Sequence, residues 1–172
     1  MTTCLLVTGG TGSISSHYVR TLCSNNYRHH QYPEKKTPLF VTNLLDVRTV
    51  PLHGDVGNVR DWLHVGDHVR GIELVRTGGR LGETYIVGGG VELTNRELTE
   101  LDLRACGCEW DDSVTFVGDH KGHGRRYAVA CTEIREELGY RPGVSFASGL
   151  AETVAWWRAN RDWWEPLKAA VR

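Results

Sequence analysis

The chain has 172 residues, of which 40% are hydrophobic and 24% are charged, and its formal net charge is −1. This length and composition fit one globular domain with a hydrophobic core. The near-neutral balance, with both signs interspersed, argues against nucleic acid or an anionic membrane as partners. The apolar run near the start, Cys4 to Val7, is too short for a signal-peptide core or a membrane span, so we expect a cytoplasmic protein.

Residues 3–20 predict a strand, a turn and a helix. Residues 3–7 favour a strand, Gly9-Gly10-Thr11-Gly12 is a turn, and residues 13–20 can be helical. Gly9 and Gly12 would let the backbone approach a pyrophosphate at the helix N-terminus. The pattern is imperfect because Ser15 occupies its third small position, and a glycine-rich turn without a ligand is the alternative.

The expected continuation of a nucleotide-binding fold does not follow Arg20. Further strand–helix repeats and an acidic residue to hold a ribose are missing. Residues 23–27 instead open a polar loop. With one N-terminal strand and no neighbours to complete a parallel sheet, this part is a stub.

The rest of the pattern predicts strands at 50–53, 84–87 and 114–117, and helices after Pro33, at Asp67, at Thr94, at Thr132 and near Ser148. Asp67 is expected to cap its helix, which Gly78-Gly79 ends. Residues 94–97, Thr-Asn-Arg-Glu, form a capping box. The last helix carries apolar residues at helical spacing, namely Leu150, Val154, Trp157 and Trp164. We interpret the tryptophans as core or docking residues.

Residues 58–68, Asn-Val-Arg-Asp-Trp-Leu-His-Val-Gly-Asp-His, place one arginine, Arg60, between a glycine-rich turn and a helix start. Trp62 and Leu63 are expected to be buried beside it. An arginine held in this way is suited to binding a diphosphate with its forked guanidinium. The alternative is a surface pair of Arg60 and Asp61 over an ordinary core tryptophan.

The cysteines are five, an odd and scattered number that suits reduced thiols: Cys4, Cys23, Cys106, Cys108 and Cys131. Cys106-Gly107-Cys108 with His120 and His123 suggests zinc, but the C-x-C spacing fits structural zinc patterns badly. We therefore predict no metal site. The adjacent His29 and His30 are interpreted as part of a polar loop.

Several segments together resemble the C-terminal half of dTDP-glucose 4,6-dehydratases, members of the extended short-chain dehydrogenase/reductase family. They are residues 25–27, 31–35, 38–43, 58–62, 82–85 and 125–127. The resemblance covers residues 23–168, and residues 4–20 resemble the family's first βα unit. It implies an α/β fold in which residues 1–22 are a truncated Rossmann-like, NAD-binding stub and residues 23–172 are the nucleotide-sugar-binding portion.

The resemblance also implies that roughly 150 residues, or several βα units of ~30 residues each, are absent between Arg20 and Cys23. In the family that segment carries a Tyr-x-x-x-Lys pair and a Thr-Asp-Glu run. This sequence contains no Asp-Glu dipeptide. Tyr32 and Lys36 have the Tyr-x-x-x-Lys spacing, but they align with a loop rather than with the family's long helix, so we interpret the match as a coincidence.

We therefore expect no catalytic residues in this chain. The resemblance implies a dTDP-glucose 4,6-dehydratase-like protein of deoxysugar (dTDP-rhamnose type) biosynthesis, a lyase family, with impaired catalysis. The alternatives are a non-catalytic partner of a full-length dehydratase and an active NAD-dependent enzyme. A homodimer, or pairing with a full-length homologue, is the expected assembly.

The site residues implied by the resemblance fall into two sets. Those for NAD are Gly9, Gly12, Ser13, Ile14 and Asn26. Those for a nucleotide-sugar of the dTDP-glucose type are Asn25, Lys35, Lys36, Pro51, His53, Arg60, Asn95, Asp119 and His123. His53 replaces a usual tyrosine, and His120 replaces an arginine near the phosphates. Arg28-His29-His30 replaces Gly-Pro-Tyr, so this loop is not expected to keep the family's shape.

Overall fold

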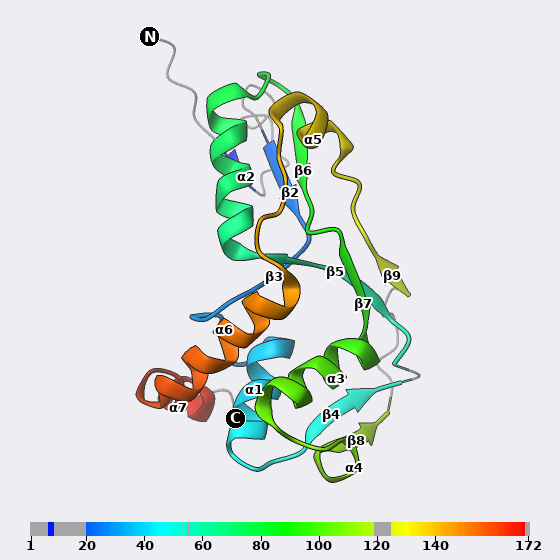
Figure 1. Ribbon diagram of the computed structural model, residues 1–172, viewed down its shortest axis with the longest axis vertical. Coiled ribbons are helices and arrows are strands. Elements are labelled where there is room, and N and C mark those ends of the chain that lie inside the picture. The colour runs from blue at the N-terminus through cyan, green and yellow to red at the C-terminus, as the bar shows by residue number, and fades with distance from the viewer. Residues whose placement is uncertain (1–6, 9–19, 55, 119–124, 171–172) are drawn as a thin grey trace. The chain divides into compact units, whose positions relative to one another are not determined.

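The computed structural model describes residues 7–8, 20–54, 56–118 and 125–170. The chain divides into two units, each assembled from three separate stretches. The first unit contains residues 1–26, 61–91 and 128–144, and the second contains residues 27–60, 92–127 and 145–172. Each unit combines helices with short strands (Figure 1).

The first unit is built on a parallel sheet with the strand order β1-β2-β6. Strand β1 (Val7–Thr8) pairs with β2 (Arg20–Cys23), and β2 pairs with β6 (Thr84–Val87). The expectation that the N-terminal strand has no neighbours is therefore wrong, and Arg20 lies in a strand rather than at a helix end. The physical reason is that β6, which completes the sheet, lies about sixty residues further along the chain, beyond the reach of a local pattern.

Two helices cover one face of this sheet. Helix α2 (Val65–Gly78) runs alongside β2 and β6 in Figure 1, and α5 (Thr132–Leu138) packs against both α2 and β6. Gly71 of α2 lets that helix approach closely, since a Cβ there would lie 2.6 Å from a methyl group of Val87. The buried cluster between helices and strands is Leu63, Val75, Tyr85, Val87, Cys131, Ile134 and Tyr140.

The start of α2 differs from the prediction. His64 is the N-cap, and its Nδ1 accepts a hydrogen bond from the backbone N–H of Gly66 at 3.3 Å. Asp67, the predicted cap, is buried and accepts hydrogen bonds from the backbone N–H groups of Gly143 and Val144, both at 3.1 Å, and it pairs with Arg70. The Asp67 carboxylate thus accepts hydrogen bonds from a loop that is distant in the sequence instead of capping α2. The N-cap of α2 lies three residues before the predicted one.

Strand β5 (Val59–His64) occupies the place where a turn leading into a helix was expected around Arg60. Trp62 and Leu63 are buried, as predicted. Asp61 is buried too, and its carboxylate accepts hydrogen bonds from the backbone N–H groups of Gly89 at 3.1 Å and Val91 at 2.9 Å. A surface pair of Arg60 with Asp61 is therefore excluded.

The polar loop predicted over residues 23–27 is also wrong in part, because Asn25–Tyr27 form strand β3. A further strand that the pattern did not predict is β7 (Val91–Thr94), which follows the glycine turn at residues 88–90. Both strands, like β5, run through points at which the chain passes from one unit to the other.

The second unit contains the other strands. Strand β4 (Val50–His53) pairs in parallel with β8 (Val114–Val117), and β9 (Arg126–Tyr127) pairs in parallel with the start of β5. The predicted strands at 50–53, 84–87 and 114–117 are thus confirmed. The short helix α4 (Trp110–Ser113) directly precedes β8.

Four longer helices complete the second unit: α1 (Lys36–Leu45), α3 (Asn95–Cys106), α6 (Phe146–Ala159) and α7 (Arg161–Ala170). Helix α1 has two buried faces. One contributes Phe40 and Leu44 to a cluster with Val50, Leu52, Val56 and Leu103. The other contributes Val41 to a cluster with Leu150, Val154, Trp157 and Trp164.

The predicted last helix is in fact two helices, separated at Asn160. The first of them, α6, begins at Phe146 after its N-cap Ser145, rather than near Ser148. Helix α5 begins at Thr132, after its N-cap Cys131. Trp157 and Trp164 are fully buried, as expected of core residues. The indole Nε1 of Trp164 donates to the carbonyl oxygen of Trp157 at 2.8 Å, which fixes α7 on α6.

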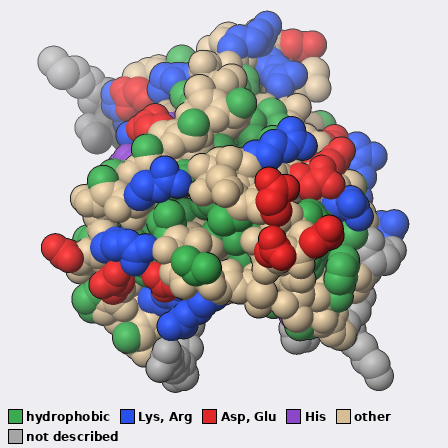
Figure 2. All heavy atoms as spheres, turned by 60° about the horizontal axis from the view of Figure 1, so that its bottom comes forward, with side chains coloured by type: hydrophobic (Ala, Val, Ile, Leu, Met, Phe, Trp, Pro, Cys, Tyr) green, Lys and Arg blue, Asp and Glu red, His purple; other side chains and the backbone are tan. Residues whose placement is uncertain are grey.

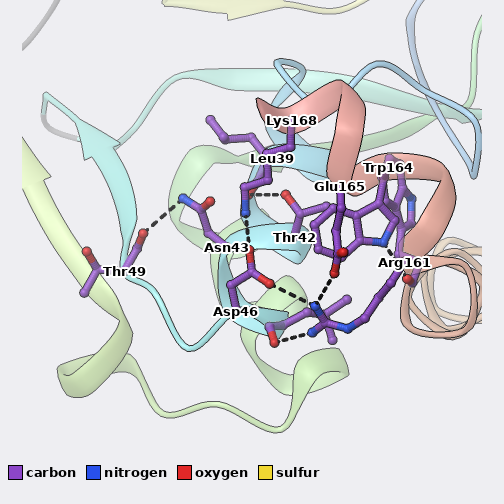
Figure 3. A network of polar contacts seen from close by, with 11 residues as sticks. Leu39, Thr42, Asn43, Asp46, Thr49, Arg161, Trp164, Glu165 and Lys168 are labelled. Carbon is purple, nitrogen blue, oxygen red and sulfur yellow. Dashed lines mark hydrogen bonds and ion pairs between the residues drawn. The ribbon is translucent and has the colours of Figure 1, made fainter. Parts of the chain in front are cut away.

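Asp46, at the C-terminal end of α1, ties α7 to α1 (Figure 3). Its carboxylate accepts a hydrogen bond from Arg161 at 3.0 Å and another from Lys168 at 2.9 Å. Arg161 also donates to the carbonyl oxygen of Leu45 at 2.6 Å. Although partial burial opposes the change, the bonds that its carboxylate accepts from Lys168 and Arg161 lower the pKa of Asp46 below its ordinary value.

The charged side chains are interspersed on the surface. Figure 2 shows lysines and arginines beside aspartates and glutamates over one face, without a broad region of a single sign. Among the described residues, no helix is long and apolar enough to cross a membrane.

We predict that Gly89→Ala strongly destabilises the protein. A Cβ at Gly89 would lie 1.7 Å from the carbonyl oxygen of Trp62, so the backbone must move and the hydrogen bond to Asp61 is disturbed. We expect a loss of about 3 kcal/mol or more in the free energy of unfolding, measured by urea denaturation. Gly118→Ala is the control, because a Cβ there meets nothing within 4 Å. Equal stability of the two variants would contradict the close contact between Gly89 and the carbonyl oxygen of Trp62.

We predict that Asp46→Asn lowers the melting temperature at pH 7, because α7 loses its two charged anchors. The pKa of Asp46 is lower in the folded chain, so its contribution is complete above the unfolded value of about 3.9 and is lost as the pH falls through the folded value. The difference between wild type and variant should therefore shrink below about pH 4. Glu136→Gln removes an exposed carboxylate and should leave the melting temperature nearly unchanged. A difference that persists at pH 2 would contradict the ionic role.

Candidate functional site

The N-terminal ends of two helices bring two predicted substrate residues together. Lys36 is the first residue of α1, and Asn95 is the first residue of α3. The ammonium Nζ of Lys36 donates a hydrogen bond to Oδ1 of Asn95 at 2.6 Å. The same ammonium lies 5.4 Å from the ring centroid of Phe40, so its stem follows an apolar surface. We call this arrangement the Lys36–Asn95 corner.

A capping box fixes the position of Asn95. The hydroxyl of Thr94 accepts a hydrogen bond from the backbone N–H of Glu97 at 3.1 Å, and the Glu97 carboxylate accepts one from the backbone N–H of Thr94 at 2.7 Å. The Glu97 carboxylate also accepts a hydrogen bond from the hydroxyl of Thr94 at 2.8 Å, and the two bonds that this carboxylate accepts lower the pKa of Glu97. The sequence pattern predicted this box, and the structure confirms it.

Backbone hydrogen bonds attach the segment before Arg60 to the same helix end. The N–H of Asn95 donates to the carbonyl oxygen of Asn58 at 3.0 Å, and the N–H of Arg96 donates to that of Val56 at 3.2 Å. Arg60 follows in β5, aligned with Tyr127 of β9, and its Nη1 donates to the carbonyl oxygen of Val59 at 2.8 Å. Its guanidinium is close enough to act electrostatically on Lys36.

The electrostatics of the corner favour an anion. Burial lowers the pKa of Lys36 to about 8, Asp102 opposes this change, and the positive charge of Arg60 adds to it. The ammonium of Lys36 and the amide of Asn95 thus meet within electrostatic range of the positive charge of Arg60. A bound phosphate or diphosphate would stabilise both cations, and Arg60 can donate to it with a forked geometry.

Asp102 is a residue of this region that the sequence analysis missed. It lies two turns after Asn95 in α3 and is fully buried, and neither carboxylate oxygen has a hydrogen-bond partner among the described residues. Burial raises the pKa of Asp102 well above its ordinary value, and Lys36 opposes this shift. Helical spacing was the available signal, because Asp102 shares a helix face with Leu98 and Thr99.

The other predicted substrate residues occupy separate places. Lys35 is exposed and pairs with Glu34 at 3.0 Å. Pro51 and His53 share the less buried face of β4, and Nδ1 of His53 lies 3.1 Å from the carbonyl oxygen of Gly118. Asn25 lies in β3, within the first unit. Asp119 and His123 lie outside the described residues.

Of the residues predicted to contact NAD, Asn26 alone lies in the described part of the chain. Gly9, Gly12, Ser13 and Ile14 fall outside it. The side-chain amide nitrogen of Asn26 donates to Sγ of Cys23 at 3.3 Å and to the carbonyl oxygen of Ser24 at 3.2 Å. Both amide hydrogens of Asn26 are therefore engaged within the chain.

The residues with a catalytic spacing do not form a pair. Tyr32 is exposed, and within the described part of the chain no hydrogen bond joins its hydroxyl to Lys36, whose ammonium bonds Asn95 instead. The described cysteines are free thiols, and no group of three or more His, Cys, Asp or Glu side chains suited to a metal occurs among the described residues.

A surface pocket of about 330 Å³ lies elsewhere in the second unit. Its lining residues are Pro33, Leu39, Asp46, Arg48, Trp164, Glu165, Lys168 and Ala169. None of them belongs to the predicted substrate set, and Asp46 and Lys168 already pair with each other. We therefore assign the candidate site to the Lys36–Asn95 corner rather than to this pocket.

Comparison with known proteins gives related sequences along most of the chain. A dTDP-glucose 4,6-dehydratase of Streptomyces antibioticus is 62% identical over 148 residues, which are 86% of this chain and 44% of that protein. The enzyme of the same name from Shigella flexneri is 39% identical over 160 residues, 88% of this chain and 44% of that protein. The chain thus spans less than half the length of these relatives.

Solved structures show the same fold. The dTDP-glucose 4,6-dehydratase DesIV of Streptomyces venezuelae, crystallised with NAD and TYD bound, matches with a TM-score of 0.86 and 57% identity over 90% of this chain and 48% of that one. The Bacillus anthracis enzyme in complex with NAD matches with a TM-score of 0.83 and 46% identity over 87% of this chain and 47% of that one. The predicted Rossmann-like α/β class of the short-chain dehydrogenase/reductases is thereby confirmed.

The family model described as GDP-mannose 4,6 dehydratase matches residues 24–153. This range includes Lys36, Arg60, Asn95 and the helices and strands that position them. Because the match covers most of the chain, and because the similar sequences and structures are dTDP-glucose 4,6-dehydratases, the protein belongs to the GDP-mannose 4,6-dehydratase family and is dTDP-glucose 4,6-dehydratase-like.

Proposed function

We propose that this chain binds the diphosphate of a nucleotide-sugar of the dTDP-glucose type and does not catalyse its dehydration. The observation that carries the proposal is the 2.6 Å hydrogen bond between Lys36 and Asn95 beside the charge of Arg60. The names of the relatives support the ligand class. In this proposal the chain is a dehydratase-like protein of deoxysugar biosynthesis with impaired catalysis.

The three side chains offer complementary contacts to a diphosphate. The Arg60 guanidinium presents several N–H donors in one plane and can bind two phosphate oxygens at once. Lys36 supplies a second positive charge. Asn95, held by the capping box and by Asn58, keeps the ammonium of Lys36 in place, so little side-chain entropy is lost on binding.

The impairment follows from which residues the chain contains. Dehydration of a sugar requires an acid and a base within hydrogen-bond reach of the substrate. The sequence has no Asp-Glu dipeptide, and Tyr32 is exposed without a hydrogen bond to Lys36 in the described part of the chain. NAD would supply the oxidation in a full-length relative.

A second role is compatible with the same site. The chain spans less than half of its relatives, so a full-length homologue could supply the remaining residues by pairing with it. Co-purification of the chain with such a homologue, compared with a preparation of the chain alone, tests this partner role.

We predict that Arg60→Ala weakens dTDP binding by about tenfold to a hundredfold, as expected when a charged hydrogen bond to phosphate is lost. Isothermal titration calorimetry with dTDP measures the effect. Arg48→Ala is the matched control, since Arg48 is an exposed arginine outside the corner. Unchanged binding in Arg60→Ala would remove this residue from the site.

We predict that dTDP binding weakens as the pH rises above about 8, because Lys36 loses its proton near that value in the free protein. The affinity should fall by up to about tenfold per pH unit until the pH exceeds the pKa of Lys36 in the complex with dTDP. Lys36→Met should bind more weakly at pH 7 and should lose this pH dependence. A wild-type profile that is flat from pH 6.5 to 9.5 would contradict the assignment.

We predict no turnover of dTDP-glucose by the purified chain with added NAD. The 4-keto-6-deoxy product is followed by its absorbance in base, with a full-length dehydratase as the positive control. Product formation by the chain alone, abolished in Lys36→Ala, would overturn the proposal of impaired catalysis and would restore Tyr32 and Lys36 as candidates.

A further inference from the structure

The surface pocket of about 330 Å³ in the second unit is lined by residues of α1, of the turn that follows it and of α7. Its volume is at the lower end of the range of small-molecule sites. The apolar part of the lining consists of Pro33, Leu39, Trp164 and Ala169. Pro33 and Trp164 are buried and Leu39 is half-buried, so core packing holds these side chains in place. The pocket can therefore receive a compact apolar group.

The carboxylates of the pocket already have cationic partners. One oxygen of Asp46 accepts a hydrogen bond from Arg161 at 3.0 Å, and the other accepts one from Lys168 at 2.9 Å (Figure 3). Glu165 accepts a hydrogen bond from Arg161 at 3.0 Å. Because both carboxylates are paired within the chain, the pocket does not require a cationic ligand.

Arg48 is a cation of the same pocket, and its guanidinium has no hydrogen bond or ion pair with any other described residue. The turn that carries it is ordered, since Val47 has a φ of 56° and the backbone N–H of Arg48 donates to the carbonyl oxygen of Asn43 at 2.9 Å. Lys168 lines the pocket too, and its bond to Asp46 uses one of its three N–H groups. The pocket thus offers unused N–H donors from two cations.

The balance of charges indicates which class of ligand fits. The cations of the pocket and its ion pairs are Arg48, Arg161 and Lys168, and the anions are Asp46 and Glu165, which leaves one excess positive charge. A ligand with a single negative charge would neutralise this excess, whereas a dianionic phosphate would place additional negative charge near Glu165. The two oxygens of a carboxylate also match the planar fork of a guanidinium.

We propose that this pocket binds a small aromatic or alicyclic monocarboxylate. The ligand's carboxylate accepts hydrogen bonds from Arg48 and Lys168, and its ring lies against Leu39 and Ala169. The residues of the Lys36–Asn95 corner do not line this pocket. The second site is therefore separate from the corner and does not depend on nucleotide-sugar binding.

The probe that tests this site is 1-naphthoate, added to the isotope-labelled chain and followed by two-dimensional amide NMR. We expect saturable shifts of the indole N–H of Trp164 and of the backbone N–H groups of Arg48, Lys168 and Ala169. For a ligand of about 13 non-hydrogen atoms, ordinary ligand efficiency gives a dissociation constant of about 1 mM. The neutral 1-naphthamide keeps the ring and lacks the charge, so it should bind about fivefold more weakly or worse.

The variant Arg48→Ala removes the unpaired cation from an exposed position. We expect a loss of naphthoate affinity of about fivefold or more, with an unchanged melting temperature showing that the variant is folded. Ala169→Phe narrows the pocket without changing its charge and should also weaken binding. Arg104→Ala is the matched control, because Arg104 is an exposed arginine of α3 that does not line the pocket.

Four results would each overturn the proposal: shifts that do not saturate, equal naphthoate affinity in wild type and Arg48→Ala, equal affinity for naphthoate and naphthamide, or displacement of naphthoate by an equal concentration of inorganic phosphate. The last would replace the carboxylate class by phosphate. Arg60→Ala should keep naphthoate binding, and Arg48→Ala should keep dTDP binding, so this proposal and the proposed function fail separately.

Discussion

The N-terminal end of α3 is the constraint on which the candidate site depends. The reciprocal bonds of Thr94 and Glu97 fix where the helix begins, and the backbone of Asn95 then bonds Asn58 while its side chain receives Lys36. One helix end therefore positions groups that are 59 residues apart in the sequence. Without that end, Lys36 would have no fixed acceptor and the chain leading to Arg60 would lose two backbone anchors.

The same corner shows the tension between binding and stability. An ammonium that is partly withdrawn from water costs free energy, and so does the fully buried carboxylate of Asp102. Their attraction offsets part of both costs, and an incoming phosphate would offset more of the cost of Lys36. Charges of this kind are expected where a protein binds an anion, since a purely stabilising core would contain apolar residues instead.

The two units differ in what they contribute. The second unit contains Lys36, Arg60 and Asn95, together with the tryptophan-rich helices α6 and α7. The first unit contains the parallel sheet and Asn26, the one described residue predicted to contact NAD. Each unit is assembled from three stretches of sequence, so neither the sheet nor the corner can form from a contiguous segment. The boundary predicted after residue 22 separates two segments by their resemblance to parts of a family, whereas the two units are defined by their compactness. The predicted boundary therefore stays a prediction.

The sequence alone determined the features that depend on neighbouring residues. The capping box at residues 94–97, the strands at 50–53, 84–87 and 114–117, the core tryptophans and the family all follow from local pattern or from motifs. The tertiary structure decided everything that depends on distant partners. It paired β2 with β6, moved the helix cap from Asp67 to His64, and placed Arg60 in a strand. It also buried Asp102 beside Lys36 and turned His29 toward His30, because charge, burial and ring orientation are set by what packs around a residue.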